Sequence, residues 1–352
     1  MRACLTCACS NYSLLTNYFT SFKHQNKIIF LIDCGTIMAA RDGVIQEDAN
    51  MEPPQPTEDD QVQQVNDDTE ALDLNHGRLE KIEQLDGLTN LKRLYLRWNF
   101  IKKIEGLNCL TNLVELELYD NQIVNIENLD LLVNLEILDL SFNRIVEIKG
   151  LESLSKLKKL YLSSNKIKEI KNVNHLEKLD LLELGDNYIR EIKNLDGMNR
   201  LLQLYLGKNK ISSIQNLQDC TKLEILVLQC NRLVTIENLD SNVKLEQLHL
   251  SENGITKIEN LTNQVELKTL DLAQNKISVI ENLNHMPELE ELWLNNNKIS
   301  DWSSVEYLKH NDRLETIYLE HNPITKDPAY RRKLMMILPT LQQIDATLCK
   351  AS

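Results

Sequence analysis

Carboxylates and aromatic rings alternate along this sequence at a constant spacing. Asp139, Tyr161, Glu183 and Tyr205 follow one another at a constant 22-residue interval. Carboxylates bind lysine and arginine, and aromatic side chains contribute large contact areas, so this combination is typical of a surface that recognises a basic protein. The constant spacing implies that the same structural unit presents each of these residues.

That unit is a repeat with the frame L-x-x-L-x-L-x-x-N-x-I-x-x-I-x-x-L. Its asparagine recurs at the same 22-residue interval, at Asn99, Asn121, Asn143, Asn165, Asn187, Asn209, Asn231, Asn253, Asn275 and Asn297. An earlier block with Gly77 in the asparagine position and a later block around Asn322 bring the number of units to about twelve. The pattern predicts an α/β leucine-rich-repeat solenoid, a curved right-handed array with a parallel sheet on its concave side.

Each part of the unit predicts a local structure. L-x-L predicts a short strand with both leucines pointing inward, and the asparagine amide can satisfy backbone groups where the chain leaves the strand. The I-x-x-I-x-x-L part predicts a return on the convex side, as an extended turn and a short helix. Nine returns carry glycine or asparagine at one position, which predicts a bend with positive φ at Gly106, Asn128, Gly150, Asn172, Asn194, Asn216, Asn238, Asn260 and Asn282.

The C-terminal part of the chain departs from the repeat. Residues 327–339 predict a capping helix, with Leu334, Ile337 and Leu338 toward the last repeat and Arg331, Arg332 and Lys333 toward water. Leu341, Ile344 and Asp345 are expected to close this cap.

Charge divides the chain further. The whole sequence has 39 Lys and Arg against 52 Asp and Glu, and residues 42–77 hold eleven acids and neither Lys nor Arg. We therefore expect a leader that matches no repeat (1–50), a disordered acidic linker (51–70), the repeats (71–325) and the cap (326–352). An extended start explains the leader more simply than the alternative, a transit peptide.

The residue between the two leucines of each L-x-L segment is expected to face outward on the concave sheet. These residues are Tyr95, Glu117, Asp139, Tyr161, Glu183, Tyr205, Val227, His249, Asp271, Trp293 and Tyr318. With the neighbouring outward positions, this face has ten acids, four cations and eight of the thirteen aromatic residues after residue 77. Exposed rings among carboxylates predict a basic protein partner and disfavour nucleic acid.

Several other functions find no support in the sequence. The seven histidines are dispersed, and although His249 could meet Asp271, nothing supplies a nucleophile or a metal set. Cys4-x-x-Cys7 lacks a second pair, and there is no phosphate-binding G-x-x-x-x-G-K. We expect a protein that is not an enzyme, without a cofactor or metal, and without an apolar run long enough to cross a membrane.

The repeat N-x-I-x-x-I-E-N-L, the cap P-x-Y-R-x-K-L…L-P-x-L-x-x-I-D and stretches such as residues 118–123 and 343–347 resemble the leucine-rich-repeat regulatory subunits of protein phosphatase 1. The resemblance covers about residues 70–348. It implies that the concave face binds the phosphatase catalytic subunit through Asp139, Tyr161, Glu183, Tyr205, Asp271, Glu291, Trp293 and Tyr318. Phe is common in relatives at the positions of Tyr161 and Tyr205.

The resemblance also implies roles in nucleus and cytoplasm, and assembly with a small phosphatase inhibitor protein. Two other interpretations remain open: a structural adaptor of a ribonucleoprotein, similar to the leucine-rich subunit of the U2 particle, and a ciliary or centrosomal scaffold. The ribonucleoprotein subunits have fewer repeats, so about twelve units disfavour that alternative.

Overall fold

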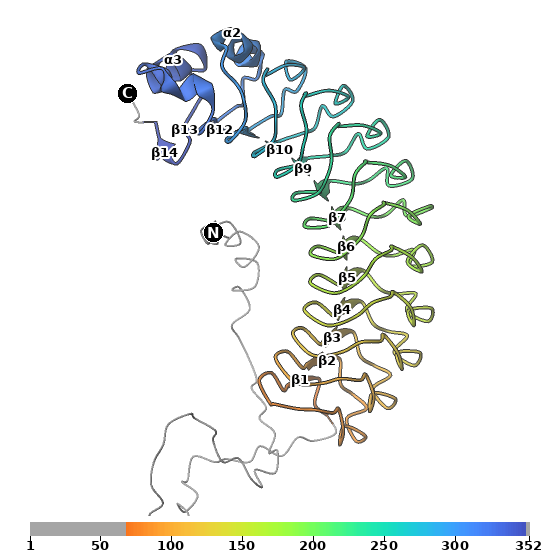
Figure 1. Ribbon diagram of the computed structural model, residues 1–352. Coiled ribbons are helices and arrows are strands. Elements are labelled where there is room, and N and C mark those ends of the chain that lie inside the picture. The colour runs from red at the N-terminus through yellow and green to blue at the C-terminus, as the bar shows by residue number, and fades with distance from the viewer. Residues whose placement is uncertain (1–67, 350–352) are drawn as a thin grey trace, which may run out of the picture. The chain divides into compact units, whose positions relative to one another are not determined.

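The computed structural model describes residues 68–349, within a compact unit that extends from Asn66 to Ser352. Figure 1 shows these residues as a curved array, in which successive turns of the chain stack and the strands line the inner, concave side. The expected leader, and the expected linker up to residue 67, lie outside the described residues.

Fourteen strands form one sheet in chain order. The first thirteen are parallel and in register, so that Leu94 lies opposite Leu116 and Leu116 opposite Leu138, and only the last pair is antiparallel. Twelve of the strands belong to repeats, which confirms the predicted solenoid. The strands are β1 (Ala71–Asp73), β2 (Arg93–Tyr95), β3 (Glu115–Glu117), β4 (Ile137–Asp139), β5 (Lys159–Tyr161), β6 (Leu181–Glu183), β7 (Gln203–Tyr205), β8 (Ile225–Val227), β9 (Gln247–His249), β10 (Thr269–Asp271), β11 (Glu291–Trp293), β12 (Thr316–Tyr318), β13 (Gln343–Ile344) and β14 (Thr347–Leu348).

Aliphatic side chains fill the interior of every turn. Leu182 of β6, Leu184 directly after it, and Ile189 and Ile192 of the following return have no exposed surface. Because each turn buries its apolar face only against the turns beside it, the stability of the array depends on stacking.

A ladder of buried asparagines holds the chain where it leaves each strand. The Asn187 amide nitrogen donates to the carbonyls of Leu184 in its own unit (3.1 Å) and Leu162 in the preceding unit (3.0 Å). Its amide oxygen accepts from the backbone N–H of Ile167 (2.9 Å). The same acceptor bond recurs from Asn99 through Asn297 and at Asn322, so the predicted ladder is confirmed.

The predicted bends in the returns are also confirmed. All nine positions have φ between 54° and 71°. The seven asparagines among them form a second ladder; Asn194, for example, donates its amide to the carbonyl of Ile170 in the preceding unit (2.7 Å). At Gly106 and Gly150 a Cβ atom would collide with the backbone carbonyl of the preceding unit, so these two units have glycine.

The short helix predicted for every return is wrong for most of them. In described residues before 300 the returns are isolated turns, in which Leu110 N–H bonds to Leu107 O and Leu113 N–H to Leu110 O (3.0 Å each). These three-residue steps already turn the side chains at the repeat's apolar positions inward, as at Leu107, Leu110 and Leu113. Only the last return, three residues longer than the others, forms helical turns, α2 (Trp302–Val305) and the 3-10 helix η2 (Glu306–His310).

The predicted cap is present. A 3-10 helix, η3 (Pro323–Lys326), precedes α3 (Tyr330–Ile337), which buries Leu334 fully, and Leu338 follows it almost fully buried. Arg331 does not face water as expected, because its guanidinium donates to the carbonyls of Ile344 (2.8 Å) and of the terminal strand.

Asp345 takes the place of a ladder asparagine at the end of the array. Its carboxylate accepts from the backbone N–H groups of Leu319 (2.8 Å) and Glu320 (2.9 Å) and from the Tyr330 hydroxyl (3.0 Å). An acceptor-only side chain suits this position because three donors, two backbone N–H groups and a hydroxyl, converge on it.

Leu334→Asp is expected to lower the free energy of unfolding by about 3 kcal/mol or more, because it places a charge against the last repeat. The control is Met336→Asp on the same helix, where the side chain is 71% exposed, and little change is expected there. Urea denaturation measures both variants, and an equal effect of the two would contradict the placement of the cap.

Asn187→Ala is expected to lower the free energy of unfolding by about 2 kcal/mol or more, since three buried backbone groups lose their hydrogen-bond partner. Asn284→Ala, which removes an exposed amide from a return, should cost little. If thermal melting shifts equally in both variants, the ladder does not make the contribution inferred here.

Candidate partner-binding face

The in-register sheet gathers the predicted partner-binding residues on the concave face. Asp139, Tyr161, Glu183 and Tyr205 end four consecutive strands, β4 to β7, and each lies opposite the next. Asp271, Trp293 and Tyr318 end β10 to β12 in the same column, and Glu291 begins β11. The two groups are separated by Val227 and His249 on β8 and β9.

The carboxylates of this column are more buried than the sequence predicted. Asp139 is only 6% exposed and Asp271 only 4%, although both were expected to face outward freely. Each lies between side chains of the strands on either side, and each accepts a hydrogen bond from a backbone N–H two residues on, Ser141 (2.9 Å) or Ala273 (3.0 Å). The large neighbours in the column, not the sheet itself, cover them.

Asp139 and Glu183, with the tyrosines of β5 and β7, form what we call the acidic group, and burial governs the protonation of its two carboxylates. Burial, together with the nearby Asp139 carboxylate, raises the pKa of Glu183 to about 7, against a hydrogen bond from Ser163. The pKa of Asp139 is also raised, chiefly by burial. Neither carboxylate forms an ion pair with another described residue, so a cation from outside would find two uncompensated acceptors.

One further carboxylate belongs to this group, although it was not among the predicted contact residues. Glu117 on β3 precedes Asp139 in the column and pairs with Arg97, with 2.5 Å between Nε and Oε2. Burial still raises the pKa of Glu117 above its usual range, because the guanidinium only partly offsets the loss of hydration. The 22-residue spacing between Glu117 and Asp139 is the sequence signal that could have placed Glu117 in this group.

The second group combines one buried acid with two rings. The rings of Trp293 and Tyr318 pack with centroids 5.4 Å apart, and His249 Nδ1 lies 3.7 Å from an Asp271 carboxylate oxygen. The indole Nε1 of Trp293 is buried and has no hydrogen-bond acceptor among the described residues. An acceptor on a partner would satisfy it.

An aromatic row lies at the N-terminal end of the face. Three of its rings, Trp98, Tyr119 and Phe142, are among the outward aromatic residues counted from the sequence, although none was a predicted contact residue. His76 stacks on Trp98 (4.4 Å between centroids, 7° between planes), Trp98 meets Tyr119 edge-on, and Tyr119 packs on Phe142 (4.8 Å). Trp98 and Phe142 directly precede ladder asparagines and remain over 40% exposed. The row extends the aromatic surface beyond the predicted residues.

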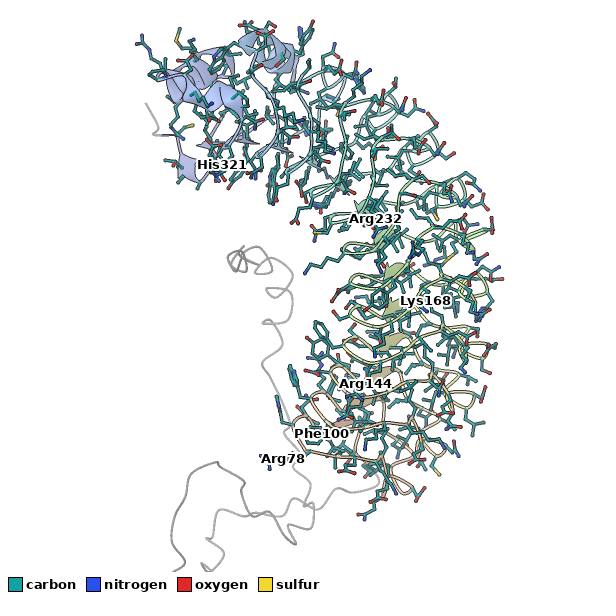
Figure 2. The ribbon with its side chains drawn as sticks, viewed as in Figure 1. Arg78, Phe100, Arg144, Lys168, Arg232 and His321 are labelled. Atoms are coloured by element: carbon teal, nitrogen blue, oxygen red, sulfur yellow. The ribbon has the colours of Figure 1, made fainter. Side chains whose placement is uncertain are left out.

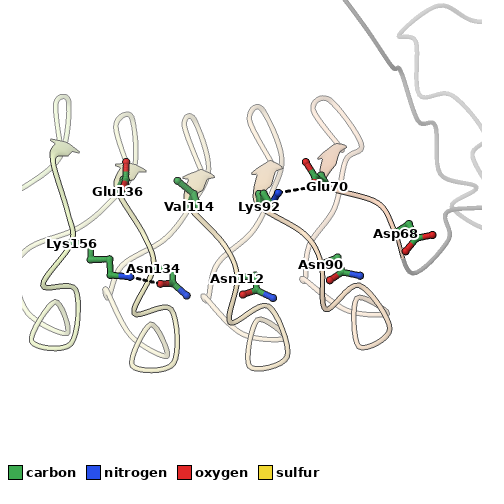
Figure 3. Close-up of a pocket in the computed structure, with 9 residues that line it drawn as sticks. All are labelled: Asp68, Glu70, Asn90, Lys92, Asn112, Val114, Asn134, Glu136 and Lys156. Carbon is green, nitrogen blue, oxygen red and sulfur yellow. Dashed lines mark hydrogen bonds and ion pairs between the residues drawn. The ribbon is translucent and has the colours of Figure 1, made fainter.

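A groove of about 680 Å³ runs across the first units, away from this column (Figure 3). Its side chains already satisfy one another: Lys92 pairs with Glu70 (2.5 Å), and Lys156 donates to the Asn134 amide oxygen (2.6 Å). Within residues 68–349 no cluster of three or more His, Cys, Asp or Glu side chains could hold a metal ion, and no helix could cross a membrane. The groove thus offers no metal-ligand set, and its lysines already have partners.

Comparison with known proteins agrees with this architecture. Residues 224–351 match a family model described as leucine-rich repeat, and residues 89–131 and 133–175 match one described as leucine-rich repeats in two copies. The chain is a leucine-rich-repeat protein. Solved structures of an internalin from Listeria monocytogenes (TM-score 0.66, 24% identity, 80% of this chain and 88% of that one) and a leucine-rich-repeat protein from Leptospira interrogans (0.61, 23%, 78% and 75%) share the fold.

Curated relatives give a narrower likeness. A stretch of 46 residues is 59% identical to protein phosphatase 1 regulatory subunit 7 of Homo sapiens and 56% identical to that of Danio rerio. The stretch covers 13% of this chain and 13% of each relative. The relatives are named as regulatory subunits of protein phosphatase 1.

The raised pKa of Glu183 predicts a pH dependence of stability. Between about pH 4.5 and 7 the folded state holds a proton that the unfolded state has lost, so the parent should lose stability as pH rises through this range and level off above it. Glu183→Gln removes this loss. The free energy of unfolding of Glu183→Gln should exceed that of the parent by an amount that grows from near zero at pH 4.5 to on the order of 1–2 kcal/mol at pH 8. This figure allows for the partial exposure of the Glu183 side chain.

Urea denaturation at several pH values measures this difference. The control is Glu237→Gln, which removes the same charge from a return. A difference between Glu183→Gln and the parent that stays constant with pH would show that Glu183 ionises freely in the folded protein.

Proposed function

We propose that this chain is a regulatory subunit that binds the catalytic subunit of protein phosphatase 1 on its concave face. The observation that carries the proposal is the column from β4 to β7, where a buried carboxylate (Asp139) and a partly buried one (Glu183), neither in an ion pair with a described residue, alternate with tyrosines. The names of the relatives supply the identity of the partner. The proposed contacts are Asp139, Tyr161, Glu183, Tyr205, Asp271, Glu291, Trp293 and Tyr318.

The geometry suits a folded protein domain better than a small ligand. From β4 to β12 the column crosses eight strand spacings, about 38 Å at ~4.8 Å each. A globular partner of ~300 residues has a comparable diameter. The acidic group and the Trp293–Tyr318 pair would then contact different regions of one partner surface.

The chemistry of the acidic group favours a basic contact. A lysine or arginine brought against Glu183 would keep the carboxylate ionised, since a nearby cation lowers a carboxylate pKa. Binding would therefore release protons near neutral pH. In this proposal the Tyr161 ring, between Asp139 and Glu183, shields the charged contacts from water, which strengthens them.

The rest of the proposal concerns the setting of the complex. By likeness to the named relatives, the chain would control the activity, maturation or targeting of the catalytic subunit in nucleus and cytoplasm. A small phosphatase inhibitor protein would join the complex. The part of the catalytic subunit left uncovered by the concave face would remain available for it.

Trp293→Ala is expected to weaken binding of purified catalytic subunit by on the order of thirtyfold, corresponding to ~2 kcal/mol for a buried aromatic anchor. Glu183→Ala should also weaken binding, and its effect should shrink as salt rises because it acts through charge. Calorimetry at two salt concentrations measures both, with circular dichroism as a check on folding.

The matched control is Glu237→Ala on the return side, which should bind like the parent. If Trp293→Ala and Glu183→Ala bind like the parent while Glu237→Ala does not, the concave face is not the interface. Recovery of spliceosomal proteins without any phosphatase in affinity purification would instead support a ribonucleoprotein adaptor.

A further inference from the structure

A second surface of the array carries only positive charge. The first and third residues after each ladder asparagine form two adjacent rows along one side, twenty positions from Asn99 to Asn297. None of these positions is an acid. Nine are cations, which we call the basic stripe: Lys102, Arg144, Lys166, Lys168, Arg190, Lys210, Arg232, Lys276 and Lys298.

The cations of the basic stripe are accessible and uncompensated. Eight are exposed and Lys210 is half-buried, and none forms an ion pair with a described residue. Figure 2 shows Phe100, Arg144, Lys168 and Arg232 following one another along the array. A row of like charges on an acidic protein, with net charge −13, repels itself and attracts an anionic partner.

Acids next to the stripe do not neutralise it. On the convex margin, Glu147 pairs with Lys171 (2.5 Å) and Glu169 with Lys193 (3.0 Å), both outside the stripe. On the concave margin, Asp186 accepts from the Ser164 hydroxyl (2.8 Å). These three neighbouring acids therefore have partners outside the stripe.

Apolar side chains lie among these cations. Phe100, Val124, Val146, Tyr188 and Val234 occupy five of the other stripe positions and are 42–57% exposed. Lys210 Nζ lies 4.6 Å from the centre of the Tyr188 ring, and a hollow of about 230 Å³ opens between Lys166 and Tyr188. A ligand of this surface would thus need both negative charge and apolar groups.

We propose that the basic stripe is a docking surface for an extended acidic polypeptide segment of a partner protein, with apolar side chains between its carboxylates. Three of the five apolar positions are exposed valines, which match aliphatic side chains and have no π-face on which a nucleobase could stack, and only Phe100 and Tyr188 offer a ring. The stripe crosses nine strand spacings, ~43 Å, the length of about 13 extended residues.

This surface is distinct from the proposed phosphatase site. Its residues follow the ladder asparagines, whereas the concave column precedes them. A change in the stripe should leave binding of the catalytic subunit unchanged, and Glu183→Ala should leave binding at the stripe unchanged.

The test uses the full chain and a fluorescein-labelled peptide of about 13 residues in which glutamate alternates with leucine. We expect binding in fluorescence anisotropy that weakens as salt rises. The double variant Lys168→Glu/Arg190→Glu should weaken it about tenfold or more, because two attractive contacts become repulsive. The matched control, Lys178→Glu/Lys222→Glu, reverses two exposed return-side lysines that form no ion pair with a described residue and should bind within about twofold of the parent.

Two further probes separate the alternatives, a peptide with lysine in place of glutamate and a single-stranded oligonucleotide. The lysine peptide should not bind at the stripe. Absence of acidic-peptide binding, parent-like binding by the stripe variant, or equal losses in both double variants would overturn the proposal. Tighter stripe-dependent binding of the oligonucleotide than of the acidic peptide would also overturn it and assign the surface to nucleic acid.

Discussion

The asparagine ladder is the constraint on which the rest of this structure depends. Each amide bonds the backbone of its own unit and of the unit before it, so it fixes the turn and the offset between units in one step. Because the 22-residue offset is the same from Asn99 to Asn297, equivalent residues lie opposite each other in the strands of these repeats. Any residue type repeated at this spacing therefore becomes a continuous column on the surface.

Such columns bring like charges together, and the resulting cost in folding stability is not visible in the sequence alone. Glu117, Asp139 and Glu183 lie in one column within three strand spacings, and all three carboxyl groups have a raised pKa, mainly because burial removes their hydration. An array selected only for stability would place polar, uncharged side chains there. The retention of buried acids favours a surface shaped for an external cation.

The sequence predicted the repeat, the register, both sets of asparagines and the cap, because each follows from local chemistry repeated many times. It did not predict the absence of helix from most returns, since the I-x-x-I-x-x-L spacing suits a helical turn and a three-residue step equally well. It also missed the burial of Asp139 and Asp271, because burial depends on the size of the side chains that the adjacent units place beside them. Arg331 was misplaced for a related reason: its acceptors belong to a terminal strand that carries no repeat signal.

The distribution of ion pairs distinguishes structural from unsatisfied charge. Before the strands and in the returns, opposite charges pair between adjacent units, as in Lys158–Glu136, Lys268–Glu246 and Lys171–Glu147. The repeat can therefore place a cation beside an acid whenever the spacing between units allows it. Asp139 and Glu183 on the concave face and the nine cations of the basic stripe form no such pairs, and each set repeats its sign at equivalent positions of different units. Since pairing across units is easily achieved, two unpaired surfaces of opposite sign are best explained by partners that supply the missing charges.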